Sequence, residues 1–240
     1  MAYVMVPFIN GKGGVGKTAI ACSYAVAQAL KGVDVLLADT NEEQRTALAW
    51  TQVRDHNSLL PKIKVEAINA RQALELVGRH DAIIVDTPGF TDRSTLALAR
   101  KATFTVIPTG PNPTYELAPT VRLLHGLRAE GIEAWRLGVV FSRFSPDEAT
   151  RQAEEQVARA YLKEAGYSAL EGCIQNASAF GAALGEGYGL TEVPDGGALV
   201  AEASHVMQVI EKGVASAERR LQRSAHQHGG TERKRGGREE

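Results

Sequence analysis

The segment Gly11-Lys12-Gly13-Gly14-Val15-Gly16-Lys17-Thr18 has the residue types and the spacing of a loop that grips phosphate groups. Its glycines let the backbone curl so that successive N–H groups point inward at phosphate oxygens. A helix is expected directly after it, and the partial positive charge of a helix N-terminus favours the same anion. Lys17 is expected to reach the β- and γ-phosphates, and the Thr18 hydroxyl to bind Mg²⁺. The sequence therefore predicts a nucleoside triphosphate site whose contacts are Gly11, Lys12, Gly13, Gly14, Val15, Gly16, Lys17, Thr18 and Ala19.

Two aspartates come directly after apolar runs of strand length. Asp39 follows Val33–Ala38, and Asp86 follows Ala82–Val85. The carboxyl ends of parallel strands meet at one edge of a sheet, where ligands of such folds bind. Either carboxylate can hold Mg²⁺ through its waters, so the predicted metal site consists of Thr18, Asp39 and Asp86. The alternative for each aspartate is a helix cap or a turn, which Asp commonly provides.

The elements that must position these residues follow an alternating pattern. Apolar runs of strand length lie at Tyr3–Ile9, Val33–Ala38, Ile63–Ile68, Ala82–Val85, Thr103–Ile107, Leu137–Phe141 and Gly172–Ile174. Helical periodicity marks Thr18–Lys31, Ala70–Arg79, Tyr115–Glu130 and Asp147–Ala165. Strands that are apolar on both faces and alternate with helices predict an α/β fold with a mostly parallel, twisted sheet and helices on both faces. Pro7 lacks an N–H, so a bulge or a local loss of pairing is expected there.

The chain divides into a globular part and a polar end. Its 240 residues, 44% of them apolar, suit one domain, placed at residues 1–223. The last long helix is expected from about Gly197 to Gln222, and residues 224–240, which contain no large apolar side chain, are expected to be a disordered tail. Residues 216–240 carry seven Lys/Arg and four Glu, a net of +3, and the overall charge is −1. An acidic body with a basic end follows.

Several classes of protein are disfavoured. Cys22 and Cys173 lie far apart, so neither a disulfide framework nor a cysteine-based zinc site is expected. No apolar run is long enough to span a bilayer, the N-terminus has no signal-peptide pattern, and residues 224–240 show no apolar helical face. A cytoplasmic protein with no membrane partner is therefore expected.

Beyond these patterns, the chain resembles a known family. The phosphate loop, preceded by Asn10 and carrying the second lysine Lys12, resembles the deviant Walker A box of the ParA/MinD ATPases. Val35–Asp39 and Ile84–Pro88 are similar to that family's switch I and switch II strands, and Ser178–Gly187 followed by Thr191-Glu192 resembles a late segment of small plasmid-partition ParA proteins. The likeness spans roughly residues 1–212. It implies a P-loop ATPase fold.

The resemblance also implies a function. In the family, the first lysine, here Lys12, crosses to the nucleotide of a second subunit, so ATP and Mg²⁺ promote a homodimer. Such dimers bind DNA non-specifically and associate with the nucleoid, and a small ParB-like or adaptor partner stimulates hydrolysis of ATP to ADP and phosphate. Cycles of this kind segregate plasmid or chromosomal DNA or position other cargo. The residues expected to support hydrolysis are Lys12, Lys17, Asn41 and Asp86.

One motif departs from the family. Switch I usually reads Asp-x-Asp-Pro-Gln, whereas this chain reads Asp39-Thr40-Asn41-Glu42-Glu43-Gln44. An amide cannot accept a proton as a carboxylate can, and loss of a general base typically costs about 10²–10⁴-fold in rate. Asn41 can still orient water; Glu42 or Glu43 can replace the missing acid or be ordinary solvated residues. A weak ATPase that needs a partner or DNA is expected, and a nucleotide-gated scaffold or filament with little hydrolysis is the alternative.

The DNA contact is left open by the sequence. Cations of the basic end can neutralise phosphates, and Arg143 and Arg151 are further candidates. A merely solubilising end is the alternative. A metabolic ligase or small-molecule kinase of similar fold is a third possible function, but no substrate motif for one is visible.

Overall fold

The computed structural model describes residues 3–89 and 92–235. Seven parallel strands form one sheet in the order β3-β2-β4-β1-β5-β6-β7. Their bounds are β1 Val4–Phe8, β2 Val35–Asp39, β3 Lys64–Ala67, β4 Ala82–Asp86, β5 Thr105–Thr109, β6 Leu137–Phe144 and β7 Ala169–Gln175. Each of the seven apolar runs contains or overlaps one of these strands, which confirms the predicted parallel sheet.

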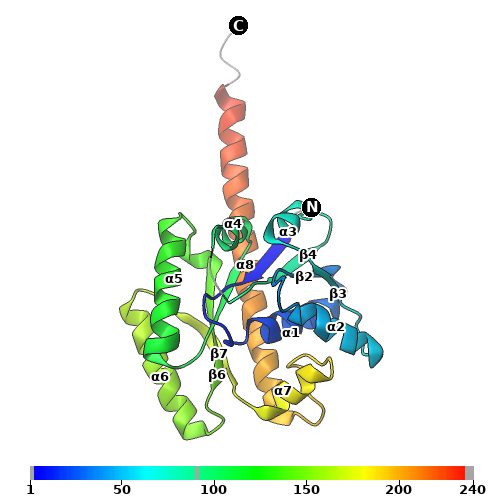
Figure 1. The fold of residues 1–240 in the computed structure, drawn as a ribbon. Coiled ribbons are helices and arrows are strands. Elements are labelled where there is room, and N and C mark those ends of the chain that lie inside the picture. Colours follow the sequence, from blue (N-terminus) through cyan, green and yellow to red (C-terminus); the bar gives the residue numbers. More distant parts are fainter. Residues whose placement is uncertain (1–2, 90–91, 236–240) are drawn as a thin grey trace.

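Helices cover both faces of this sheet (Figure 1). The helices are α1 Lys17–Ala29, α2 Thr46–His56, α3 Ala70–Glu75, α4 Arg93–Lys101, α5 Ala118–Ala129, α6 Glu148–Glu164, α7 Ser178–Gly185 and α8 Gly197–Arg235, with a π-helical turn at Pro113–Leu117 and a 3₁₀ turn at Ala134–Arg136. Alternate residues of β1 enter different cores: Val6 and Phe8 pack with α1, α2, α7 and α8, whereas Met5 packs with α3 and α4. A third cluster joins α5 and α6 to β5 and β6.

Pro7 affects one side of its strand only. β1 keeps an unbroken register with β4 from Val4 to Phe8, so the expected bulge is absent on that side. Toward β5, only Phe8 has a strand partner, Val106. Ile9 N–H donates to the Val106 carbonyl at 2.9 Å, so Pro7, two residues earlier, lies with its missing N–H on the β5 side. The predicted local loss of pairing is confirmed there.

The helix ends differ from expectation at two places. α3 ends at Glu75 rather than Arg79, because Leu76 already makes a tighter bond to Ala73 and Gly78 takes a left-handed φ of 85°. α8 does not stop near Gln222 but continues to Arg235, so most of the segment expected to be disordered is helical. Ala225, Gln227 and residues 232–235 are good helix formers, whereas Gly229 and Gly230 are poor ones, so helix propensity accounts for only part of this extension. Residues 236–240 of the predicted tail lie outside the described residues.

The direction of α8 follows from its contacts. Glu202, near its start, accepts hydrogen bonds from Gln175 at the carboxyl end of β7. Further along, Gly213 lies against Phe104 just before β5, and the Arg220 guanidinium stacks over Trp135 just before β6, at 5.6 Å. The helix therefore runs antiparallel to the strands and leaves the body at their amino ends (Figure 1). Within residues 3–89 and 92–235, no helix combines the length and apolarity needed to cross a membrane.

Candidate nucleotide site

The predicted phosphate loop joins β1 to α1 at the carboxyl edge of the sheet. Gly14 and Gly16 have φ of 75° and 88°, a region that glycine enters without steric cost. A Cβ on Gly16 would lie 2.6 Å from the Ser142 hydroxyl, so the close approach of β6 also requires glycine. Gly16 occupies the N-cap of α1 and has no side chain to bond the first N–H groups of that helix. Those donors are available to an anion.

The two lysines of the loop lie in different environments. Lys17 is buried, and its Nζ donates to the Lys12 carbonyl at 3.0 Å. Burial lowers the pKa of Lys17, and the negative charge of Asp86 opposes that shift. The Lys12 side chain is exposed, while its backbone N–H donates to Asn10 Oδ1 at 2.9 Å. Lys17 is thus fixed inside the site, and Lys12 faces outward.

The buried Asn10 side chain connects the start of the phosphate loop to the end of β5 and to α5. It is 1% exposed, and its amide Nδ2 donates to the Pro108 carbonyl at 2.8 Å and to Thr120 Oγ1 at 3.0 Å. Because the same side chain accepts from the Lys12 N–H, the backbone at Lys12 is connected to the end of β5 and to α5. The position from which Lys12 extends is therefore set by the sheet.

Asp86 has the features of a cation ligand. It is 1% exposed, its Oδ2 accepts from Thr18 Oγ1 at 2.7 Å, and its Oδ1 has no hydrogen-bond partner among the described residues. Burial raises the pKa of Asp86 to about 7; the charge of Asp39 adds to the rise, while the Thr18 hydrogen bond and the Lys17 charge oppose it. A buried carboxylate oxygen without a partner is costly unless something binds it. The pair of Thr18 and Asp86 therefore fits Mg²⁺, a cation that prefers oxygen ligands.

Asp39 lies beside Asp86 but is fully engaged. The two residues are register partners in adjacent strands, and Asp39 is likewise 1% exposed. Its Oδ1 accepts from the Asn41 N–H and its Oδ2 from the Leu48 N–H, both at 3.1 Å. These contacts are those of the alternative reading, a carboxylate that closes a turn and caps the start of a helix. Its predicted role as a metal ligand stays a prediction.

Asn41 bonds within its own loop. Its Oδ1 accepts from the Gln44 N–H at 3.2 Å, and its Nδ2 donates to Gln44 Oε1 at 3.0 Å. Glu42 and Glu43 are exposed. Asn41, Glu42 and Glu43 line one side of a cleft of about 460 Å³, and Thr87 and Pro88 of the switch II segment line another. The structure thus brings the three candidates for orienting water to a cavity next to the site.

The segment after Asp86 packs against the phosphate loop with no space between the two backbones. Thr87 Oγ1 donates to the Phe8 carbonyl at 2.7 Å. A Cβ on Gly89 would lie 3.0 Å from Gly13 Cα and 3.2 Å from Gly13 N, so any larger residue would require the two backbones to move apart by a few tenths of an ångström. The phosphate loop and this segment are therefore in direct contact.

A second cavity, of about 480 Å³, adjoins the loop at Gly16 and Ala19. It lies at the ends of β6 and β7 and beside α7, and its lining includes Ser142, Arg143, Asn176, Phe180, Leu184 and Leu190. A largely apolar hollow with a few polar groups suits a purine base. Apart from Arg143, these residues are not among those predicted from the sequence. Ser142 and Asn176 do lie at strand ends, as Asp39 and Asp86 do, and that position is the signal by which they could be found. Below, this cavity is called the base pocket.

Arg143 lies at the rim of the base pocket. Its backbone takes a left-handed φ of 64°, and its Nη1 donates to the Gly14 carbonyl at 2.6 Å. Its described contact is therefore with the phosphate loop, whereas Arg151, the other candidate for DNA contact, donates to the carbonyls of Ser145 and Pro146 at 3.3 Å. The DNA roles expected of these arginines stay predictions.

Several known proteins are similar to this chain in sequence or in fold. Maintenance of carboxysome distribution protein A of Gloeobacter kilaueensis is 32% identical over 204 residues, which are 84% of this chain and 90% of that protein. The ATP complex of a McdA variant from Cyanothece has a TM-score of 0.69 at 15% identity, covering 89% of this chain and 97% of that one. MinD of Pyrococcus horikoshii with Mg-ADP has a TM-score of 0.68 at 14% identity, covering 90% and 98%.

A family model supports the same assignment. The model described as the CobQ/CobB/MinD/ParA nucleotide binding domain matches residues 6–187, a span that includes the phosphate loop, both aspartates and the lining of the base pocket up to α7. The ParA/MinD resemblance and the α/β P-loop fold expected from the sequence are thereby confirmed. The chain belongs to the CobQ/CobB/MinD/ParA nucleotide-binding family, whose ParA and MinD members are ATPases.

Proposed function

We propose that this protein is an ATP-dependent switch that dimerises when it binds ATP and positions cargo over DNA. The observation that carries the proposal is the contrast between the two lysines of one loop: Lys17 is buried among the phosphate-binding groups, and Lys12 is exposed at the surface. A buried lysine serves the nucleotide of its own chain. An exposed lysine beside the same nucleotide can reach the phosphates of a second copy, where it relieves the repulsion between two anionic ligands.

The chain's own groups divide the work on the triphosphate. The N–H groups of residues 13–18 and the start of α1 hold the phosphate oxygens, and Lys17 neutralises charge that develops on them. Bound Mg²⁺ supplies further positive charge at the β- and γ-phosphates, and Thr18 and Asp86 are the residues that would hold it. Asp86 must be ionised to do so, which releases the proton that its raised pKa retains near neutral pH.

Hydrolysis is proposed to be slow in the isolated protein. The residue at the position of the usual acid, Asn41, is bonded to Gln44 and has no basic oxygen. Phosphoryl transfer depends mainly on positioning and electrostatics, so turnover can still occur when the loop is rearranged by a partner or by DNA. Loss of the γ-phosphate then ends the attraction between the two copies.

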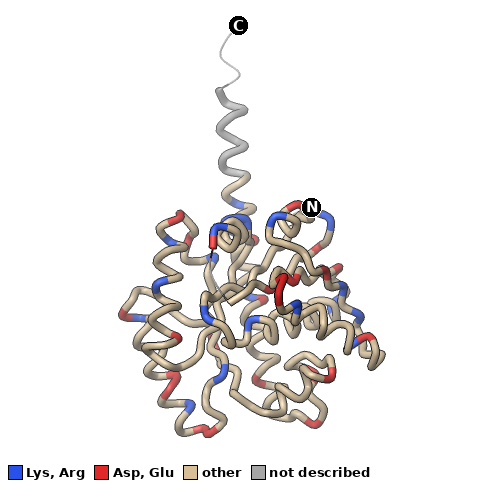
Figure 2. The backbone as a smooth tube through the Cα atoms, viewed as in Figure 1, with Lys and Arg blue, Asp and Glu red and all other residues tan. Residues whose placement is uncertain are grey.

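The cargo is proposed from the relatives. The curated relative maintains carboxysome distribution, so cargo in this family is not restricted to DNA. We propose that the ATP-bound dimer holds DNA without sequence preference and that an adaptor of the ParB kind links it to a plasmid or another particle. Arg219, Arg220 and Arg223 are the cations of the basic end whose side chains the structure describes, and all three are exposed on α8. Over the body, acidic and basic residues are mixed in the view of Figure 2. We therefore place the proposed DNA contact on these three arginines of α8.

Size-exclusion chromatography with light scattering tests the proposal. The full chain is expected to be a monomer without nucleotide and a dimer with ATP and Mg²⁺. Lys12→Ala is expected to bind ATP but remain monomeric, whereas Lys17→Ala loses ATP itself. Lys62→Ala, which removes an exposed lysine paired with Asp55 on the surface, is the matched control and should behave as wild type. A wild-type protein that stays monomeric with ATP, or a Lys12→Ala variant that dimerises, contradicts the proposal.

The locked position of Asn41 favours one alternative, a nucleotide-gated scaffold or filament with almost no hydrolysis. The two functions differ in the lifetime of the assembly. The protein is loaded with labelled ATP and then mixed with excess unlabelled ATP. The size of the assembly and the formation of labelled ADP are then followed over time, and together they distinguish the two functions. A dimer that decays as ADP forms supports the switch, and assemblies that persist without ADP formation support the scaffold.

A further inference from the structure

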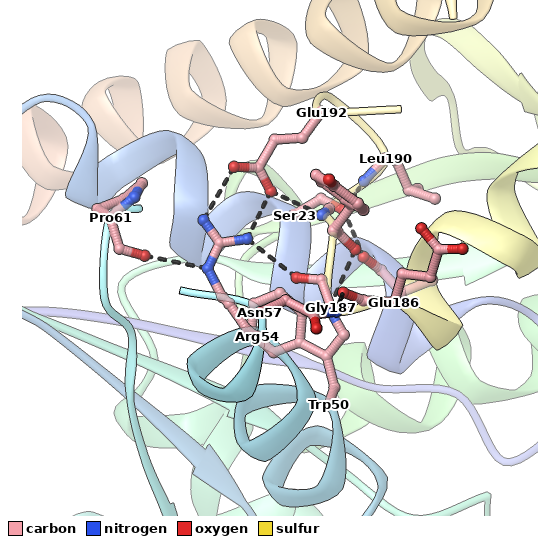
Figure 3. Close-up of polar contacts among 12 residues, drawn as sticks. Ser23, Trp50, Arg54, Asn57, Pro61, Glu186, Gly187, Leu190 and Glu192 are labelled. Carbon is pink, nitrogen blue, oxygen red and sulfur yellow. Dashed lines mark hydrogen bonds and ion pairs between the residues drawn. The ribbon is translucent and has the colours of Figure 1, made fainter. Parts of the chain in front are cut away.

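A loop far from the phosphate groups is attached to the helix that follows switch I. The loop comprises residues 186–192, between α7 and α8, and the helix is α2. Trp50 Nε1 donates to the Tyr188 carbonyl at 3.0 Å, and Asn57 Nδ2 donates to the Glu186 carbonyl at 2.9 Å. Between them, Arg54 makes the central contacts of the attachment (Figure 3). One helix therefore bonds the loop at three successive turns.

Arg54 is entirely buried, and four of its five guanidinium N–H groups donate to described oxygens. Its Nη1 donates to Glu192 Oε2 at 2.7 Å and its Nη2 to Glu192 Oε1 at 2.9 Å, a two-point ion pair. Its Nη1 also donates to the Gly187 carbonyl and its Nε to the Pro61 carbonyl, both at 3.0 Å (Figure 3). A buried guanidinium with a two-point carboxylate partner fixes both geometry and distance. The pair thus determines where the loop lies relative to α2.

The loop is pressed against α2 without spare volume. Gly187 has a φ of 84°, and a Cβ there would lie 2.5 Å from Arg54 Cα and N. Glu192 Oε2 also accepts from the Gly189 N–H at 2.7 Å, so one carboxylate oxygen connects Arg54 to the backbone of the loop. The chain from Gly187 to Glu192 is therefore held in one conformation from both ends.

One residue of the same loop, Leu190, belongs to the wall of the base pocket. Leu190 lines that cavity together with Ala19 and Ile20 of α1. The Leu190 N–H donates to Ser23 Oγ at 2.8 Å, and Ser23 Oγ donates to the Ala19 carbonyl at 2.6 Å. Leu190 and Glu192 are only two residues apart, so the ion pair on one side and Ser23 on the other determine where the wall of the pocket lies.

We propose that Arg54 and Glu192, assisted by Ser23, are positioning residues for the nucleotide base: they hold residues 187–192 so that Leu190 forms part of the wall against which a purine packs. The inference rests on the proposed function, because the occupant of the cavity is the base of the bound nucleotide. It assigns to these residues no contact with the phosphates, which lie at the other end of the site. Their removal should weaken ligands that carry a base and spare ligands that consist of phosphates alone.

The test compares ATP with inorganic tripolyphosphate, each titrated calorimetrically in Mg²⁺ into the full-length protein. Wild type is expected to bind ATP more tightly than tripolyphosphate. Glu192→Gln breaks the two-point pair and is expected to weaken ATP about 10- to 100-fold while tripolyphosphate changes less than about twofold. Ser23→Ala removes the bonds to the Leu190 N–H and the Ala19 carbonyl but leaves no buried charge unpaired. It is expected to weaken ATP binding about threefold and to leave tripolyphosphate binding unchanged. Glu75→Gln, in an exposed pair with Arg71, is the control and should match wild type.

The outcomes separate the inference from the function beneath it. Equal loss of both ligands, or no loss of ATP in Ser23→Ala, overturns the positioning role while ATP binding by wild type leaves the proposed function intact. If Glu192→Gln does not fold, as judged by circular dichroism, Ser23→Ala decides alone. A wild type that binds neither ligand overturns the proposed function, and the positioning role with it.

Discussion

β2 and β4 each end in an aspartate at the same level of the sheet, but the two carboxylates differ in their hydrogen bonds. Asp39 and Asp86 are register partners and are equally buried. Asp39 gives both oxygens to backbone N–H groups, whereas Asp86 has one oxygen bonded to Thr18 and one without a described partner. A satisfied carboxylate stabilises its loop, and an unsatisfied one costs stability and is available to a ligand. From this difference we predict a structural role for Asp39 at the end of β2 and a ligand-binding role for Asp86 at the end of β4.

Asp86→Asn is expected to have the largest effect of the substitutions that test this difference between the two aspartates. The amide keeps an oxygen for Thr18 but has no charge for a cation, so affinity for Mg-ATP is expected to fall about 10- to 100-fold. At pH 8 the free energy of unfolding without nucleotide is expected to rise by about 1 kcal/mol, because a buried charge with an unpartnered oxygen has been removed. Calorimetric titration and urea unfolding measure the two quantities. A variant that loses both affinity and stability would place Asp86 among structural carboxylates.

The second largest effect is expected from pH, because the pKa of Asp86 is about 7. Only the ionised carboxylate suits Mg²⁺, so the affinity for Mg-ATP is expected to rise about tenfold per pH unit up to about pH 7 and to level off above it. Stability without nucleotide has the opposite sign. The folded protein retains a proton that the unfolded chain releases near pH 3.8, so this stabilisation is present below pH 3.8 and is lost as pH rises through 7.

Titrations between pH 5.5 and 8.5 measure this dependence. Asp86→Asn serves as the control, since ATP itself also takes up protons, and only the additional slope of wild type belongs to Asp86. Identical slopes for the two proteins would show that the carboxyl is already ionised throughout this range.

Asp39→Asn is expected to have a smaller effect, and on stability instead of on nucleotide affinity. One acceptor oxygen becomes an amide donor that faces either the Asn41 or the Leu48 N–H, so one buried hydrogen bond is lost. The free energy of unfolding is expected to fall by about 1–3 kcal/mol. Affinity for Mg-ATP should change less than about threefold, and the same pair of measurements applies. A loss of affinity as large as that of Asp86→Asn would restore Asp39 to the metal site.

Asn41→Asp is expected to have the smallest effect. A carboxylate at this position restores the usual acid, but Asn41 is bonded to Gln44, so the single-turnover rate of ATP hydrolysis is expected to rise only a few-fold, below the 10²–10⁴ that a well-placed general base typically contributes. Asn41→Ala, which has neither a base nor these bonds, should keep the wild-type rate. A rise above about 10² would show that the loop after β2 turns toward the phosphates without a partner.

Sequence patterns predicted the parts of the molecule that lie in one continuous segment. The phosphate loop could be identified because its glycines, lysine and threonine are consecutive, and the strands could be predicted because burial on both faces requires unbroken apolar runs. Their position at strand ends could have indicated Ser142 and Asn176 of the base pocket, but not Leu190, which lies in a loop between two helices. Arg54 gave no signal either: an arginine on a helix is usually solvated, and only the fold brings Glu192, 138 residues later, to its guanidinium.

The length and direction of α8 determine how far its end, the arm that follows Arg220, extends from the body. Its 39 residues span about 58 Å at about 1.5 Å per residue, and it leaves the body at the amino ends of the strands, opposite to the edge that bears the phosphate loop. Two copies that meet at their nucleotide edges would therefore carry these arms at opposite poles, pointing apart. A short oligonucleotide could touch one arm only, whereas a longer duplex could bridge both, so tight binding by the pair would begin at a threshold length of DNA.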